Sequence, residues 1–224
     1  MRILSLHGMG TTSEFSNSLN VNPITAGIRQ ELGGDKFHEF DFVEGNVDWA
    51  PAKGIQLLCP KATEFFSFFD PSDAHSALDA LDSLQDYVDA EGPFDGVMGF
   101  SQGATLAAML LLRANNRPIR PAFSFAVFFC GGAPMCESSL RKGIVRYLDP
   151  SVDSARVTVP TANIVGKHDE NLAYSMRLVD VCSEKTRTLF DHGASHEIPF
   201  QPKTISGDMA RCIEAVMAKA VFAQ

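Results

Sequence analysis

The sequence predicts an α/β fold in a single domain spanning residues 1–224, with a mostly parallel sheet and helices on both of its faces. Short apolar runs alternate with longer amphipathic stretches along the whole chain. Several of the short runs are apolar almost without interruption, which is typical of strands buried on both sides. A length of 224 residues, 45% of them hydrophobic, suits one sizeable core.

Each predicted element follows from this alternation. The runs with the length and composition of strands are Arg2–Leu6, Lys36–Val43, Gly96–Gly99, Ser124–Phe129, Thr161–Val165 and Thr186–Phe190. The helical patterns between and after them are Pro23–Leu32, Ala74–Ala90, Gln102–Ala114, Ser138–Leu148, Asn171–Ser183 and Thr204–Phe222. Right-handed crossovers are expected where a helix joins two parallel strands.

The segment from Glu44 to Pro71 breaks this rhythm. It has no clear periodicity and is crowded with proline, glycine and aromatic residues. A loop of this length is usually functional or disordered, and its aromatic content argues against disorder. We therefore consider a lid or a wall of an acyl pocket, with Phe65, Phe66, Phe68 and Phe69 as candidate substrate contacts. The alternative is a surface loop anchored on the core by its phenylalanines.

Composition excludes several classes of partner. The net charge is −8, from 19 basic and 27 acidic residues, so nucleic acid and anionic membranes are not expected to bind. Five scattered cysteines without a C-x-x-C pair argue against a disulfide framework and against a thiolate zinc site. We expect neither a metal nor a cofactor. The apolar N-terminal run is short enough to be a first strand, and a reduced, cytoplasmic protein is the default expectation.

One motif indicates chemistry. Gly99-x-Ser101-x-Gly103 lies between an apolar run and a helical pattern that opens at Gln102. A strand–turn–helix with small flanking residues exposes a serine on a tight turn, as in the nucleophile elbow of the α/β-hydrolase fold. The five-residue pattern alone is weak, and a serine that merely caps a helix is the alternative. The context favours Ser101 as a nucleophile.

A nucleophilic serine needs a base and an acid, which follow it in the order Ser, Asp or Glu, His in this fold. His192 and His196 lie between the last predicted strand and the last predicted helix. His196 is better placed to reach back over the elbow and is the predicted base. His192 is expected to have a structural role. Asp169 follows the strand Thr161–Val165 and is the predicted acid. A helix N-cap role for Asp169, and Glu170 as the acid, are the alternatives.

An oxyanion hole requires two backbone N–H groups. Gln102 supplies one, at the start of the helix after the nucleophile. The turn Leu6-His7-Gly8-Met9-Gly10 leaves the first predicted strand, and we assign the second donor to Met9. His7 is expected to support this turn by hydrogen bonding.

With these residues placed, the chain resembles the FSH-type serine hydrolase family over nearly its whole length. That family includes a human ovarian tumour-suppressor candidate and fungal polyketide-releasing thioesterases. The markers are LSLHGMGTTSEF, FDFVEG followed by PAKGI, EGPFDGVMGFSQGATLAAML, IVGKHDE and HGASHEIP. Ser195 stands where the family often has a second glycine. Carried over by position, the resemblance implies the same triad of Ser101, Asp169 and His196.

The resemblance also implies a substrate class. Its fungal members act on thioesters or esters of acyl chains made by polyketide synthases. The leading hypothesis is a thioesterase that releases a polyketide or fatty acyl chain from an acyl carrier protein through an acyl-enzyme at Ser101. A carboxylesterase acting on small free esters is the alternative. A ligand-binding module without catalysis is a third possibility, from a different class.

Overall fold

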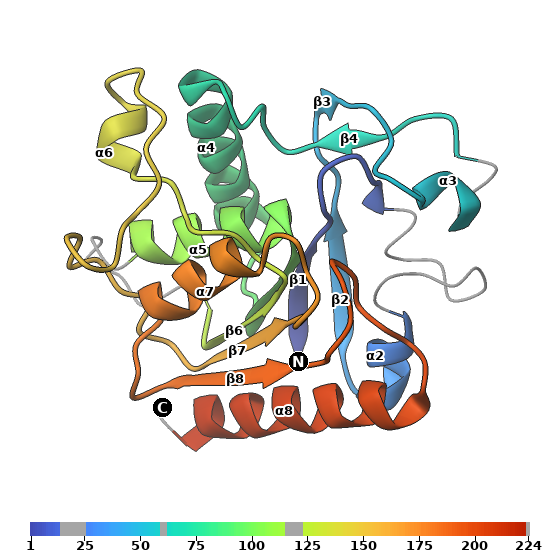
Figure 1. The fold of residues 1–224 in the computed structure, drawn as a ribbon. Helices are drawn as coiled ribbons and strands as arrows, with labels where there is room; N and C mark the ends of the chain where they lie inside the picture. Colours follow the sequence, from blue (N-terminus) through green and yellow to red (C-terminus); the bar gives the residue numbers. More distant parts are fainter. Residues whose placement is uncertain (14–25, 59–61, 115–122, 223–224) are drawn as a thin grey trace.

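A six-stranded parallel sheet forms the centre of the molecule (Figure 1). The computed structural model describes residues 1–13, 26–58, 62–114 and 123–222. In sheet order, the strands are β2 (Glu39–Val43), β1 (Arg2–Leu6), β5 (Gly96–Phe100), β6 (Phe125–Phe129), β7 (Thr161–Val165) and β8 (Arg187–Asp191). All five pairings are parallel. The predicted α/β fold and its main strands are confirmed, with shifts of a few residues at the ends.

Helices cover both faces of the sheet (Figure 1). On one face lie α2 (Ala26–Glu31) and the long α8 (Lys203–Phe222), and the 3-10 turn Gly34–Lys36 follows α2. On the other lie α4 (Ala74–Glu91), α5 (Gln102–Ala114), α6 (Glu137–Leu140) and α7 (Leu172–Val181). Residues 23–25 of the first predicted helix lie outside the described residues.

Strand β6 shows why both faces are filled. All five of its residues are buried. Because side chains alternate across a strand, Phe125, Val127 and Phe129 pack in the hydrophobic cluster that includes α8. Ala126 and Phe128 pack in the cluster that includes α4, α5 and α7. A continuous apolar run is therefore what a strand between two helical layers requires.

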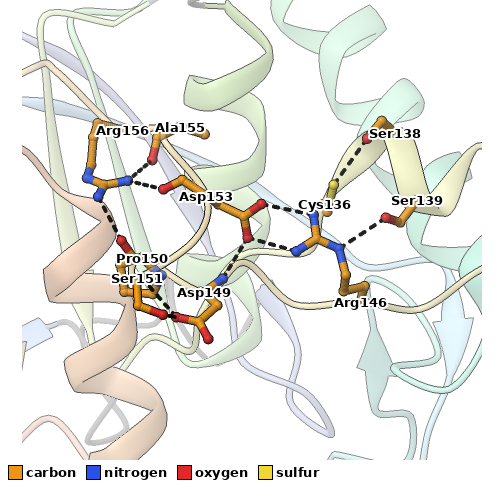
Figure 2. A network of polar contacts seen from close by, with 10 residues as sticks. All are labelled: Cys136, Ser138, Ser139, Arg146, Asp149, Pro150, Ser151, Asp153, Ala155 and Arg156. Atoms are coloured by element: carbon orange, nitrogen blue, oxygen red, sulfur yellow. Dashed lines mark hydrogen bonds and ion pairs between the residues drawn. The ribbon is translucent and has the colours of Figure 1, made fainter.

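The predicted helix Ser138–Leu148 is wrong. Only Glu137–Leu140 is helical, and Gly143 adopts a φ of 73°, a left-handed conformation that ends helices. The chain is then held by polar contacts centred on Arg146, whose Nη1 and Nη2 lie 2.7 and 3.1 Å from the carboxylate oxygens of Asp153 (Figure 2). Tyr147 pairs with Met135 as an isolated β-bridge.

The expectation that Glu44–Pro71 lacks regular structure is wrong in part. It contains β3 (Val47–Asp48), α3 (Ile55–Leu58) and β4 (Phe66–Ser67), with β3 and β4 paired antiparallel. Residues 59–61 lie outside the described residues. The segment also pairs with the turn after β1, since Gly10 N–H donates to Phe66 O at 2.8 Å. Strands of two residues are too short to show an alternating pattern.

The helices and the cysteines of the described residues bear on a membrane span and on a disulfide framework. No helix in the described ranges combines the length and the apolar character needed to cross a membrane. Cys130, Cys136, Cys182 and Cys212 are free thiols, and Cys59 lies outside the described residues.

Candidate active site

The strand β5 passes into helix α5 through a tight turn at Ser101. Ser101 has a φ of 51°, which is uncommon for a residue other than glycine. A Cβ on Gly99 would lie 2.5 Å from Ala104 N, and one on Gly103 would lie 2.5 Å from His7 O. Both flanking glycines are therefore required by close backbone approach. The turn has the geometry of a nucleophile elbow.

Ser101, His196 and Asp169 are brought together at the carboxyl ends of three strands. Ser101 Oγ lies 2.9 Å from His196 Nε2, and His196 Nδ1 lies 2.7 Å from Asp169 Oδ2. The Asp169 side chain is fully buried, and its Oδ1 accepts a hydrogen bond from Asn171 N at 2.7 Å. This arrangement can accept a proton from the serine hydroxyl and stabilise the resulting imidazolium.

The alternative base and acid lie elsewhere. His192 is buried, its Nδ1 accepts from Ala194 N–H at 3.1 Å, and its Nε2 is 3.7 Å from Cys130 Sγ. Burial lowers the pKa of His192 and so favours its neutral form. Glu170 is exposed, whereas Asp169 faces His196. The geometry therefore favours His196 and Asp169.

The turn after β1 stands beside the elbow. Met9 and Gln102 border one cavity with Ser101 and His196. Within the described part of the chain, neither Met9 N–H nor Gln102 N–H has a backbone hydrogen-bond partner. Both groups thus remain available to an oxyanion, and Gln102 lies at the N-terminus of α5, where the helix dipole favours negative charge.

His7 supports this turn, as expected. Its Nδ1 lies 2.7 Å from Gly8 O, its Nε2 accepts from Gly45 N–H at 2.8 Å, and its ring stacks on Phe68 at 4.5 Å. Glu44 Oε1 is 2.9 Å from the same Nε2. Burial raises the pKa of the Glu44 carboxyl, but the contact with His7 and the hydrogen bonds from Ser13 outweigh it and hold the pKa below its usual value.

The side chain of Gln102 joins the elbow to the segment that ends at Pro71. Its Oε1 accepts from Ser67 Oγ at 2.9 Å and from Phe68 N–H at 2.8 Å. Its Nε2 donates to Phe69 O at 2.8 Å. The amide therefore uses both of its polar atoms to fix the backbone beside the cavity. Sequence reasoning considered only the backbone N–H of Gln102.

The cavity at Ser101 has a volume of about 310 Å³. Its lining includes the side chains of Phe69, Pro71, Tyr147 and Tyr174. Of the phenylalanines expected to contact substrate, Phe69 alone borders it. The other three are not among its lining residues: Phe65 packs on Ile55, Phe66 belongs to β4, and Phe68 stacks on His7. Their role as substrate contacts stays a prediction.

Several cavity residues were missed by sequence reasoning, namely Tyr147, Asn171, Tyr174 and Ser175. Three of these come soon after the predicted acid: Asn171 is the N-cap of α7, and Tyr174 and Ser175 lie in its first turn. The available signal was position: in an open parallel sheet, the loops at the carboxyl ends of strands surround the ligand.

Cys130 lies behind the acid. Its Sγ, a carboxylate oxygen of Asp169 and a ring nitrogen of His196 all lie within 4.8 Å of one another. Burial and the neighbouring Asp169 carboxylate raise the pKa of the Cys130 thiol to about 12. Two members of this group, Asp169 and His196, contact each other at 2.7 Å, from Asp169 Oδ2 to His196 Nδ1.

A parallel sheet of this order, an elbow serine and a histidine–aspartate pair at its carboxyl edge define a hydrolase of the α/β-hydrolase fold. The solved structures agree on the fold: Arabidopsis thaliana SOBER1 superposes with a TM-score of 0.59 at 17% identity, covering 99% of each chain. The chain belongs to the serine hydrolase (FSH1) family, whose model matches residues 1–207.

Relatives in this family carry esterase names. Esterase FPY3 of Fusarium mangiferae is 44% identical over 225 residues, covering 100% of both chains. Esterase FUS5 of Gibberella fujikuroi is 28% identical over 214 residues, covering 88% of this chain and 79% of its own. Family membership and these names support hydrolysis of ester-type bonds as the activity of this chain.

Proposed function

We propose that the chain cleaves an acyl thioester or ester through an acyl-enzyme on Ser101. His196 acts as general base and acid, and Asp169 orients the imidazole. The observation that carries this proposal is the continuous relay of 2.9 Å from Ser101 Oγ to His196 Nε2 and 2.7 Å from His196 Nδ1 to Asp169 Oδ2. Such distances are those needed for proton transfer between heavy atoms.

The proposed reaction has two halves. His196 Nε2 takes the Oγ proton while Oγ attacks the substrate carbonyl carbon, and the resulting oxyanion is bound by the N–H groups of Met9 and Gln102. Collapse of the tetrahedral intermediate breaks the bond to the thiol or alcohol, which receives the proton from His196. A water molecule then repeats the sequence on the acyl-enzyme and releases the acid, which regenerates Ser101.

The proposed substrate is a polyketide or fatty acyl chain held as a thioester on a carrier protein, in fungal secondary metabolism. The resemblance of the sequence to fungal polyketide-releasing members supports this choice. The second candidate is a carboxylesterase acting on small free esters. The esterase names of the relatives favour it, as does a cavity of about 310 Å³, near the lower end for small-molecule sites.

A competition of matched substrates separates these candidates. The kcat/KM of an acyl N-acetylcysteamine thioester is compared with that of the oxygen ester of the same acyl chain. A thioesterase gives the larger value for the thioester over several acyl groups, and the reverse order supports the carboxylesterase. A further gain when the same acyl group is carried on a carrier protein supports release from a synthase.

The assignment of the base has its own control within the chain. His196→Ala should lower kcat by about 10³-fold or more, because Ser101 then lacks a proton acceptor. His192→Ala should retain substantial activity, since His192 Nδ1 binds Ala194 N–H and does not face Ser101. A larger loss in His192→Ala, with both variants folded, would reverse the assignment.

A further inference from the structure

The start of helix α7 forms one wall of the cavity that contains Ser101. Asn171 and Ser175 both border this cavity together with Ser101 and His196. They are four residues apart across the first turn of the helix, so their side chains lie on the same face. This wall therefore contains two residues with polar side chains beside the space that a bound acyl group would occupy.

Ser175 has no internal use for its hydroxyl. The residue is 2% exposed, and its Oγ is buried without a hydrogen-bond partner in the described part of the chain. A serine in a helix commonly bonds the carbonyl oxygen four residues earlier. Here Asn171 O accepts from the backbone N–H of Ser175 at 3.2 Å, and Oγ remains unpaired. An unpaired buried hydroxyl costs stability, and this one belongs to a residue that lines the cavity at Ser101.

The side chain of Asn171 also lacks the hydrogen bond that is usual at its place in the helix. An asparagine at a helix N-cap usually accepts a hydrogen bond from an N–H in the first turn. The side chain of Asn171 makes no such bond, although the residue is the N-cap of α7. The backbone N–H of Asn171 donates to Asp169 Oδ1 at 2.7 Å, and this hydrogen bond holds Asn171 beside the proposed acid. The amide is thus free of its usual role and borders the cavity.

We propose that Asn171 and Ser175 form a polar subsite that binds an oxygen of the acyl group, and that the substrates are acyl esters or thioesters with a hydroxyl or carbonyl group along the chain. This proposal rests on the proposed function. The amide offers a donor and an acceptor, and the serine hydroxyl offers both. Binding requires that hydroxyl to face the cavity, and a serine changes the direction of its hydroxyl by rotation between staggered rotamers, without movement of the helix. A plain alkyl chain would leave both groups unpaired.

The test uses p-nitrophenyl hexanoate and its derivatives that carry one hydroxyl or keto group at carbon 3, 4 or 5. We expect the kcat/KM of at least one oxygenated ester to exceed that of the alkyl ester by about tenfold or more, since a site built for hydrogen bonding rejects analogues that lack the polar group. In Ser175→Ala and in Asn171→Ala, this ratio should fall toward one.

Ser206→Ala is the matched control. Ser206 is also a helical serine with 2% exposure, but its Oγ donates to Lys203 O at 3.0 Å, away from the cavity. It should lower Tm and leave the substrate ratio unchanged, whereas Ser175→Ala should not lower Tm, because the lost hydroxyl has no partner.

Two results would overturn the subsite. The first is a wild-type ratio near one for every oxygenated ester. The second is a preference that survives both Ser175→Ala and Asn171→Ala. Failure of the proposed function looks different: no ester in the series, the alkyl ester included, would be hydrolysed, and Ser101 would not react with a fluorophosphonate.

Discussion

Replacement of Gln102 by alanine should separate the side chain of this residue from its backbone. The backbone N–H of Gln102 remains in the variant, so the proposed oxyanion hole keeps both donors. The hydrogen bonds with Ser67 Oγ, Phe68 N–H and Phe69 O are lost. Since Phe69 borders the cavity, the variant tests whether this amide stabilises the cavity wall.

The expected loss of stability depends on which of the three partner groups keep a hydrogen bond when the Gln102 side chain is removed. Ser67 Oγ and Phe69 O still bond each other at 2.7 Å. Phe68 N–H loses its acceptor in a residue that is 5% exposed. One orphaned buried N–H costs about 1–3 kcal/mol, and loss of the other bonds adds about 1 kcal/mol. The free energy of unfolding should therefore fall by about 2–4 kcal/mol, with a decrease in Tm of about 5–15 °C.

Gln85→Ala is the matched control for this measurement. Gln85 is also a buried helical glutamine, but its Nε2 donates to Asp89 Oδ1 at 2.8 Å, within α4. Urea unfolding and ester hydrolysis are measured for both variants. We expect the larger loss of stability, and an increase in KM, in Gln102→Ala. Equal unfolding free energies within about 0.5 kcal/mol, with KM unchanged, would refute the reasoning.

Two further predictions concern the acid and the thiols. Asp169→Asn should lower kcat by at least about 10²-fold near pH 7, with partial recovery at higher pH, because an amide can stabilise the wrong imidazole tautomer. The control variant Glu170→Gln should keep a kcat near that of the wild type. If the pH–rate profiles show the larger loss in Glu170→Gln, the acid is Glu170. Burial opposes ionisation of Cys136, but hydrogen bonds from neighbouring serines and an arginine lower its pKa to about 7, whereas burial raises that of Cys130 to about 12. Alkylation by iodoacetamide, followed by peptide mass spectrometry, should therefore rise at Cys136 as the pH passes 7 and level off above about pH 8. Faster labelling of Cys130 would contradict this order.

The elements around the nucleophile were predictable because their signals are local. Gly99 lies near the end of β5 (Gly96–Phe100), Ser101 follows the strand, and Gly103 lies in the first turn of α5. Both glycines are required by close backbone approach at the elbow, so the signal is contained in five consecutive residues. The order of Ser101, Asp169 and His196 along the chain reflects the order of the strands that carry them. The sheet was predictable for a related reason, since buried parallel strands are apolar on both faces.

The parts that were missed depend on contacts between residues distant in space. The amphipathic pattern at Ser138–Leu148 predicted a helix, but the bidentate contact of Arg146 with Asp153 holds a different path. The four phenylalanines between Glu64 and Asp70 are alike in sequence, and the packing of a two-stranded sheet on the turn after β1 decides that Phe69 alone borders the cavity.

The face of α7 that borders the cavity was likewise decided by tertiary packing. Its periodicity predicts a helix but not which residues lie beside Ser101. Position after Asp169 was the available clue, because a helix that follows the acid must begin at the carboxyl edge of the sheet.

Covalent labelling of Ser101 tests the central claim most directly. The wild-type protein is treated with a fluorophosphonate, and the adduct is located by intact-mass and peptide mass spectrometry beside Ser101→Ala and His196→Ala. We expect a single adduct, on Ser101, whose formation is accompanied by loss of esterase activity. The adduct should be absent in Ser101→Ala and should form far more slowly in His196→Ala. An adduct on another residue, or retention of more than about a tenth of the activity by folded Ser101→Ala, would contradict the account.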